Sequence, residues 1–156
     1  MMRPHRWLRA GLLFFTAAET LIGAWAQLWP RSFYDNFPLP GHRWVANLPA
    51  YNEHVLRDFG GLNLALALLF AVAAVTLRTV LVRAVLGAYL VFAVPHLIFH
   101  LNHLHPFGTV DATAQAVALT AVAVLPVALL ALTRQPAGRS RSPDATTART
   151  VHRTGP

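Results

Sequence analysis

The sequence predicts an all-α fold: a four-helix transmembrane bundle with both termini on the cytoplasmic side, followed by a basic C-terminal tail that is disordered. Three observations support this. Of the 156 residues, 55% are hydrophobic and only 12% are charged, about half the charged share of an ordinary soluble domain. The apolar residues form four long runs. The basic residues, thirteen in all, gather mostly on one side of these runs.

The four apolar runs cover residues 7–29, 51–77, 80–104 and 112–132. Each can supply the roughly 20 residues that a helix needs to cross the hydrocarbon core. Only helices and closed barrels span a bilayer, and these runs lack the alternation of barrel strands. We therefore expect one membrane domain over residues 1–135 and a polar tail over 136–156, which cannot bury a core.

The arginines indicate the orientation of the spans. Ten of them precede the first run, flank the turn between the second and third runs, or follow the fourth run, whereas three lie on the other side. Basic residues concentrate in cytoplasmic loops, so both termini are expected in the cytoplasm. All basic residues are arginine, as is typical of a high-GC bacterial genome, and we expect a multi-pass protein of the bacterial inner membrane, that is, the plasma membrane. The same topology signal explains most of the net charge of +7, so nucleic-acid binding is not predicted.

The N-terminus also has features of a cleavable signal peptide. Arginines precede an apolar stretch that contains Ala24-Trp25-Ala26, which resembles a cleavage site. Glu19 interrupts that stretch, however, and the apolar run continues to Trp29. We therefore expect the first span to remain uncleaved.

Ionisable side chains at membrane depth are the main functional signal. Glu19 lies near the middle of the first run, and His96 lies past the middle of the third. Such groups cost several kcal/mol unless they are paired, and they often mark function. Most other histidines and acids lie toward the same, outer side: His42, His54, His100, His103, His105, Asp35, Glu53, Asp58 and Asp111.

Helical spacing groups these residues into stripes. His96, His100 and His103 are spaced i, i+4 and i+7, so they share one face of the third span. His54 and Asp58 are one turn apart on the second span, and Pro95 is expected to kink the third span so that its histidines turn inward. In an antiparallel bundle these groups would converge. The predicted metal ligands are His54, Asp58, His96, His100 and His103, and the predicted catalytic residues are Glu19, Asp58 and His96.

Imidazoles with carboxylates suit iron, copper or zinc, and the chain has no cysteine for thiolate chemistry. The sequence is interpreted as a metal-dependent oxidoreductase that acts on a small lipophilic molecule within the lipid. Iron or copper is the favoured metal, because either ion suits oxidation. A metal-free acid–base isomerase or cyclase using Glu19, Asp58 and His96 or His100 is the first alternative. A haem held by His54 and His100, or a non-catalytic sensor or accessory subunit, is the second. Four spans with so few polar residues would line a channel only as a homo-oligomer.

Some polar residues have simpler structural interpretations. Glu53 and Arg57 are spaced as a helical ion pair, which is common and weak. Asn63 beside Gly60 and Gly61 indicates close helix packing joined by a polar contact. His103 and His105 are equally compatible with ordinary loop positions.

Residues 33–104, about half of the chain, resemble known proteins in three motifs. They are Phe33-Tyr34-Asp35-x-Phe37-Pro38, Tyr51-Asn52-Glu53-His54-x-x-Arg57-Asp58 and Pro95-His96-x-x-x-His100. This stretch resembles small uncharacterised bacterial four-span membrane proteins, which implies a shared site but no activity. The general layout is similar to that of DoxX-type proteins, whose motifs are not matched. Vitamin K epoxide reductase is similar in size and span number, but its paired cysteines are absent here.

Overall fold

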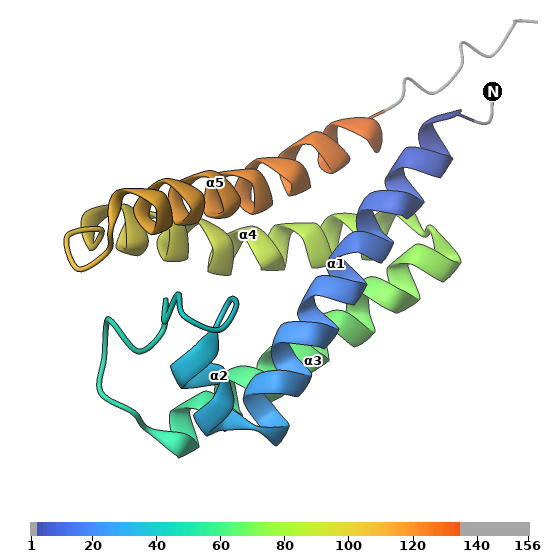
Figure 1. The fold of residues 1–156 in the computed structure, drawn as a ribbon. Helices are drawn as coiled ribbons and strands as arrows, with labels where there is room; N and C mark the ends of the chain where they lie inside the picture. Colours follow the sequence, from blue (N-terminus) through green and yellow to red (C-terminus); the bar gives the residue numbers. More distant parts are fainter. Residues whose placement is uncertain (1–2, 135–156) are drawn as a thin grey trace, which may run out of the picture.

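The computed structural model describes residues 3–134 and contains five helices there, shown in Figure 1: α1 (Arg3–Leu28), α2 (Pro30–Asn36), α3 (Glu53–Thr76), α4 (Thr79–Asn102) and α5 (Thr109–Leu132). Helices α1, α3, α4 and α5 are long and apolar enough to cross a membrane. The prediction of an all-α fold with four long apolar helices is therefore confirmed. The tail predicted over residues 136–156 lies outside the described residues.

The short helix α2 was not expected from the sequence. Pro30 opens it at a position where a missing N–H costs nothing, and Phe33 is buried beneath it. Phe33 packs with Ala26 and Leu56 in a small apolar cluster. This cluster fixes the start of the long connection between α1 and α3 against the bundle.

The long helices form two pairs, in which α1 packs along α3 and α4 packs along α5. The start of α1, the two-residue turn between α3 and α4, and the end of α5 lie together at one end of the molecule (Figure 1), here called the turn end. Helix α2, residues 37–52 and the connection between α4 and α5 lie at the other end, here called the loop end. The pairs diverge toward the loop end (Figure 1).

Two glycines allow the close contact between α1 and α3. A Cβ atom on Gly60 would lie 2.5 Å from the backbone nitrogen of Gln27, and one on Gly23 would lie 2.9 Å from the carbonyl oxygen of Gly60. Close packing at this point is thus confirmed. The polar contact differs from the expectation, because the Asn63 side-chain amide donates to the Phe59 carbonyl of its own helix at 2.6 Å.

The apolar core fills the turn end and the middle of the bundle. Phe15 and Phe70 stack with their ring centroids 5.0 Å apart, and Tyr89 packs against both rings. On α1 the buried residues follow helical spacing through Leu8, Leu12 and Phe15. The next position on this stripe is Glu19, so the sequence directs a carboxyl group toward the interior at the edge of the core.

Candidate functional site

A cavity of about 800 Å³ lies between the helices and beneath the loop over residues 37–52. This volume falls within the range of small-molecule sites. Most of the wall is apolar, with side chains from all four long helices, including Phe15, Phe59, Phe92 and Leu119. The polar lining includes Glu19, Asn63, Tyr89, His96, His100, His103 and Gln115. Within residues 3–134, no arginine or lysine lines this cavity.

Glu19 lies at the deep side of the cavity, only 3% exposed. The side chain of Tyr89 on α4 lies next to it. Its second carboxyl oxygen, Oε2, is buried and has no hydrogen-bond partner among the described residues. The sequence singled out Glu19 correctly as an interior residue, but it did not identify Tyr89 as its neighbour. The site therefore presents a carboxyl oxygen whose hydrogen-bonding capacity is unused.

His96 and His100 lie one turn apart on α4, and their ring centroids are 4.5 Å apart. The His96 ring also stacks on Phe92 at 5.0 Å. His100 Nδ1 lies 2.9 Å from the amide oxygen of Gln115 on α5. Since an amide oxygen only accepts, His100 donates through Nδ1 and keeps the lone pair on Nε2. Both imidazoles line the cavity, as predicted for one face of the helix.

Gln115 was not predicted as a site residue. It is 1% exposed and opens onto the cavity from the first turns of α5. Its amide oxygen contacts His100, whereas its amide nitrogen Nε2 is buried without a partner in the described part of the chain. A glutamine on an apolar helix is a weak sequence signal, since only the tertiary fold shows that it faces His100.

His103 and His105 lie at the loop end, beyond His100. His103 Nδ1 donates to the Phe99 carbonyl at 2.7 Å, and its ring stacks on Phe99 with centroids 4.1 Å apart. His103 thus continues the predicted stripe, but one ring nitrogen is committed to its own helix. His105 is exposed in the connection that follows and contributes to the cavity wall at the loop end.

The structure does not bring His54 and Asp58 to this cavity. Their side chains are 3.2 Å apart and are 84% and 63% exposed. The buried stripe of α3 runs through Leu56, Gly60 and Asn63. A residue two positions away lies about 200° around a helix of 3.6 residues per turn. His54 and Asp58 therefore lie away from this buried stripe, and unlike His100 they do not line the cavity.

The predicted set of five metal ligands is consequently divided between two surfaces. Among residues 3–134, no three His, Asp or Glu side chains are placed to hold one metal ion. His96 and His100 are the two predicted ligands that adjoin each other within the cavity. Glu53 and Arg57 form the expected helical ion pair, with 2.8 Å between Arg57 Nη2 and Glu53 Oε1, and Arg57 also donates to the Gln27 carbonyl of α1.

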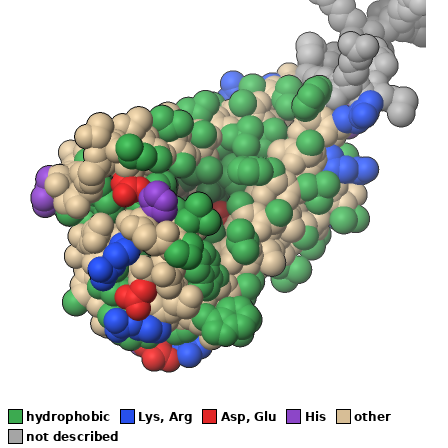
Figure 2. Space-filling model, viewed as in Figure 1, with side chains coloured by type: hydrophobic (Ala, Val, Ile, Leu, Met, Phe, Trp, Pro, Cys, Tyr) green, Lys and Arg blue, Asp and Glu red, His purple; other side chains and the backbone are tan. Residues whose placement is uncertain are grey.

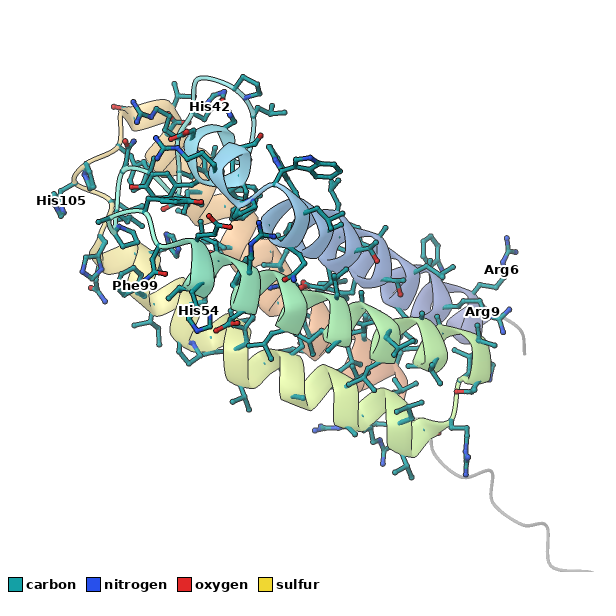
Figure 3. The ribbon with its side chains drawn as sticks, turned by 90° about the horizontal axis from the view of Figure 1, so that it is seen from below. Arg6, Arg9, His42, His54, Phe99 and His105 are labelled. Carbon is teal, nitrogen blue, oxygen red and sulfur yellow. The ribbon has the colours of Figure 1, made fainter. Side chains whose placement is uncertain are left out.

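The loop over residues 37–52 covers the cavity and is attached to α5. Trp44, Val45 and Leu48 contribute to the cavity wall. His42 Nδ1 lies 2.6 Å from Asp111 Oδ1, and the Trp44 indole donates to the same oxygen at 3.0 Å. Figure 3 shows His42 in this loop, here called the cap. The sequence placed His42 and Asp111 on the same side of the membrane, but no spacing rule connects a loop residue to a helix 69 positions away.

Comparisons of the chain with protein-family models, with curated proteins and with solved structures found no match.

Proposed function

We propose that this protein is an acid–base isomerase of the bacterial plasma membrane that acts on a small lipophilic molecule in its cavity. The observation that carries this proposal is that Glu19, whose carboxyl oxygen Oε2 has no partner among the described residues, lines the same apolar cavity as the imidazoles of His96 and His100. A largely apolar cavity with a few convergent polar groups is the usual form of a small-molecule site. Glu19 and His96 are the proposed catalytic residues.

The proposed topology places both termini in the cytoplasm and the cavity toward the outer leaflet. Its support is the distribution of arginine, since Arg6, Arg9, Arg78, Arg83 and Arg134 all belong to the turn end. Basic residues favour the cytoplasmic side. The cavity lies at the opposite, loop end, where lipid and a lipophilic molecule are the expected partners.

The proposed reaction moves one proton within a three-atom unit of the ligand. Glu19 Oε2 takes the proton from an O–H or C–H group at one end of the unit and returns it to a carbon at the other end. No other reactant is needed, because one proton is removed and one is returned, and the proton in transfer can exchange with water while it is on the carboxyl group or the ligand hydroxyl. Tyr89 lies next to the Glu19 side chain and limits its movement, and an N–H of His96 donates to the ligand oxygen on which charge develops.

Deuterium transfer tests the reaction while the substrate itself is still unidentified. Purified protein in detergent is incubated in D₂O with a lipid extract of the source cells, and the extract is then analysed by mass spectrometry. Wild-type protein should add carbon-bound deuterium to a lipophilic component, and Glu19→Gln should lose this activity while remaining folded. Equal incorporation by both proteins, or by neither, contradicts the proposal.

A metal-dependent oxidoreductase is the second candidate function, favoured by the 4.5 Å separation of the His96 and His100 rings. Two imidazoles one turn apart on a helix can bind one ion, and iron or copper would then supply the redox chemistry. Elemental analysis and an absorption spectrum of purified protein distinguish the candidates. One equivalent of iron or copper that is lost in His96→Ala and His100→Ala, but kept in His105→Ala, would replace the acid–base proposal. A Soret band would instead indicate haem.

A further inference from the structure

Two buried side-chain atoms on the cavity have unused hydrogen-bonding capacity. Glu19 Oε2 is an acceptor and Gln115 Nε2 is a donor, and neither has a partner within residues 3–134. The two residues are 3% and 1% exposed, and both line the cavity. Buried polar atoms are almost always hydrogen-bonded in folded proteins. A bound molecule that supplies a donor to Glu19 and an acceptor to Gln115 would satisfy both.

The rise along helix α4 gives the separation between the levels of these two residues in the bundle. Glu19 contacts Tyr89, and Gln115 contacts His100, eleven residues farther along the same helix. At 1.5 Å of rise per residue the two levels are about 16 Å apart. Phe92 and the ring of His96, which stack on each other, line the cavity between them. The space that joins the two atoms is therefore long and mostly apolar.

The charge of the lining restricts the chemistry of the ligand. No arginine or lysine lines the cavity in the described part of the chain, so a phosphate-bearing lipid head finds no permanent cation there. An ammonium group could also donate to Glu19, but burying its charge in a mostly apolar cavity costs more than burying an uncharged hydroxyl. An uncharged oxygen function at each end satisfies both residues, with a hydroxyl at Glu19 and a carbonyl at Gln115.

The cavity walls also indicate how such a molecule enters. At the turn end α1 and α5 are in contact, since a Cβ atom on Gly11 would lie 2.6 Å from the Leu129 side chain. Toward the loop end the two helices diverge, and Ile22 of α1 and Val122 of α5 contribute to the cavity wall. Figure 2 shows a hollow on this face with hydrophobic side chains around it. A lipophile can therefore enter sideways from the lipid.

We infer that the ligand is an elongated, uncharged lipophile that enters between α1 and α5 and carries a hydroxyl bound by Glu19 and, about 15 Å away, a carbonyl bound by Gln115. The inference rests on the proposed function and names its substrate class. The hydroxyl end is the reacting end, because an enol hydroxyl can pass its proton through Glu19 to carbon. The carbonyl end fixes the position of the molecule along α4.

A series of hydroxyketones tests this length requirement by equilibrium binding to the purified protein in detergent. The probes have equal carbon numbers, and the extended distance between their two oxygens is about 8, 15 or 20 Å, bracketing the separation set by α4. Their hydroxyl is a saturated alcohol, which donates the same hydrogen bond but cannot tautomerise, so the assay reports binding alone. Matched ketones without the hydroxyl, alcohols without the ketone, and amine and phosphate analogues complete the set.

The intermediate probe should bind at least tenfold more tightly than the other lengths and the single-function controls. Gln115→Leu should abolish the gain in affinity that the ketone gives, and it should keep the gain that the hydroxyl gives. Glu19→Met should have the reverse effect. Affinity that follows carbon number alone, or tighter binding of the amine or phosphate analogue by wild-type protein, overturns the inference. If either result is found while deuterium transfer still depends on Glu19, the substrate class is wrong and the proposed function stands.

Discussion

The carboxyl group of Glu19 and the side chain of Tyr89 lie next to each other where α1 faces α4, at the boundary between the apolar core and the cavity. Tyr89 belongs to both regions, because its ring packs on Phe15 and Phe70 while it also lines the cavity. The core therefore fixes the tyrosine beside the carboxyl group. The carboxyl oxygen Oε2, which has no partner among the described residues, is left for a ligand.

This arrangement predicts that Glu19 lowers the stability of the fold. Glu19→Met removes a buried oxygen without a partner and should raise the free energy of unfolding by about 1–3 kcal/mol. Tyr89→Phe removes the polar hydroxyl beside the carboxyl group and should lower the free energy of unfolding by about 1 kcal/mol. Thermal unfolding in detergent measures both changes. A loss of stability in Glu19→Met as large as that of the core variant Phe15→Ala would show that Glu19 is structural.

The contact between α1 and α3 predicts a sharp difference between two glycines. Gly60→Ala places a Cβ atom 2.5 Å from the backbone nitrogen of Gln27, which cannot move without displacing α1. We expect a loss of about 1–3 kcal/mol, the usual cost of overpacking. Gly87→Ala is the matched control, because a Cβ atom there meets nothing within 4 Å and alanine favours the helix. Equal unfolding midpoints for the two variants would contradict the close packing.

Much of the fold follows from local properties of the sequence. The four apolar runs are long enough to identify the spans, and the spacing of Leu8, Leu12, Phe15 and Glu19 places the acid on the buried face of α1. Helix α2 was missed because it is only seven residues long and is stabilised by the burial of Phe33 rather than by a periodic pattern.

The candidate site was predictable only in part, for physical reasons that differ between residues. His96 and His100 share a face of one helix, so their spacing alone placed them together. His54 and Asp58 also share a face, but which face of α3 meets the bundle is decided by Gly60 and its contact with Gln27. If the position of Gly60 had been used to decide which face of α3 is buried, His54 and Asp58 would have been placed apart from His96 and His100. The contacts of Gln115 depend on tertiary structure, and spacing does not reveal them.

The absence of cysteine makes the proposed topology directly testable. Single cysteines are introduced at Leu39, in the loop over residues 37–52, and at Thr79, at the turn between α3 and α4; both positions are exposed. A membrane-impermeant maleimide should label Leu39→Cys in intact spheroplasts, and Thr79→Cys only after lysis, because the arginine distribution places the turn in the cytoplasm. The cysteine-free wild type is the background control. The reverse labelling pattern would place the cavity on the cytoplasmic side.

The last prediction concerns the cap over the cavity. Asp111 Oδ1 accepts hydrogen bonds from His42 and from Trp44, so a single oxygen on α5 holds the loop over residues 37–52 in place. Asp111→Ala should release the loop, and hydrogen–deuterium exchange of its backbone amides should rise at least tenfold, while exchange in the helices stays unchanged. Asp111→Asn keeps an acceptor oxygen for the Trp44 indole and should give an intermediate increase. Asp35→Ala is the matched control: it removes another acid at the loop end, one bonded at 2.7 Å to Arg31 within α2, and should leave exchange of residues 42–48 unchanged. If Asp111→Ala and Asp35→Ala have the same effect on these residues, the contact with Asp111 does not hold the cap, and the burial of Phe37, Val45 and Leu48 alone must keep the loop over the cavity.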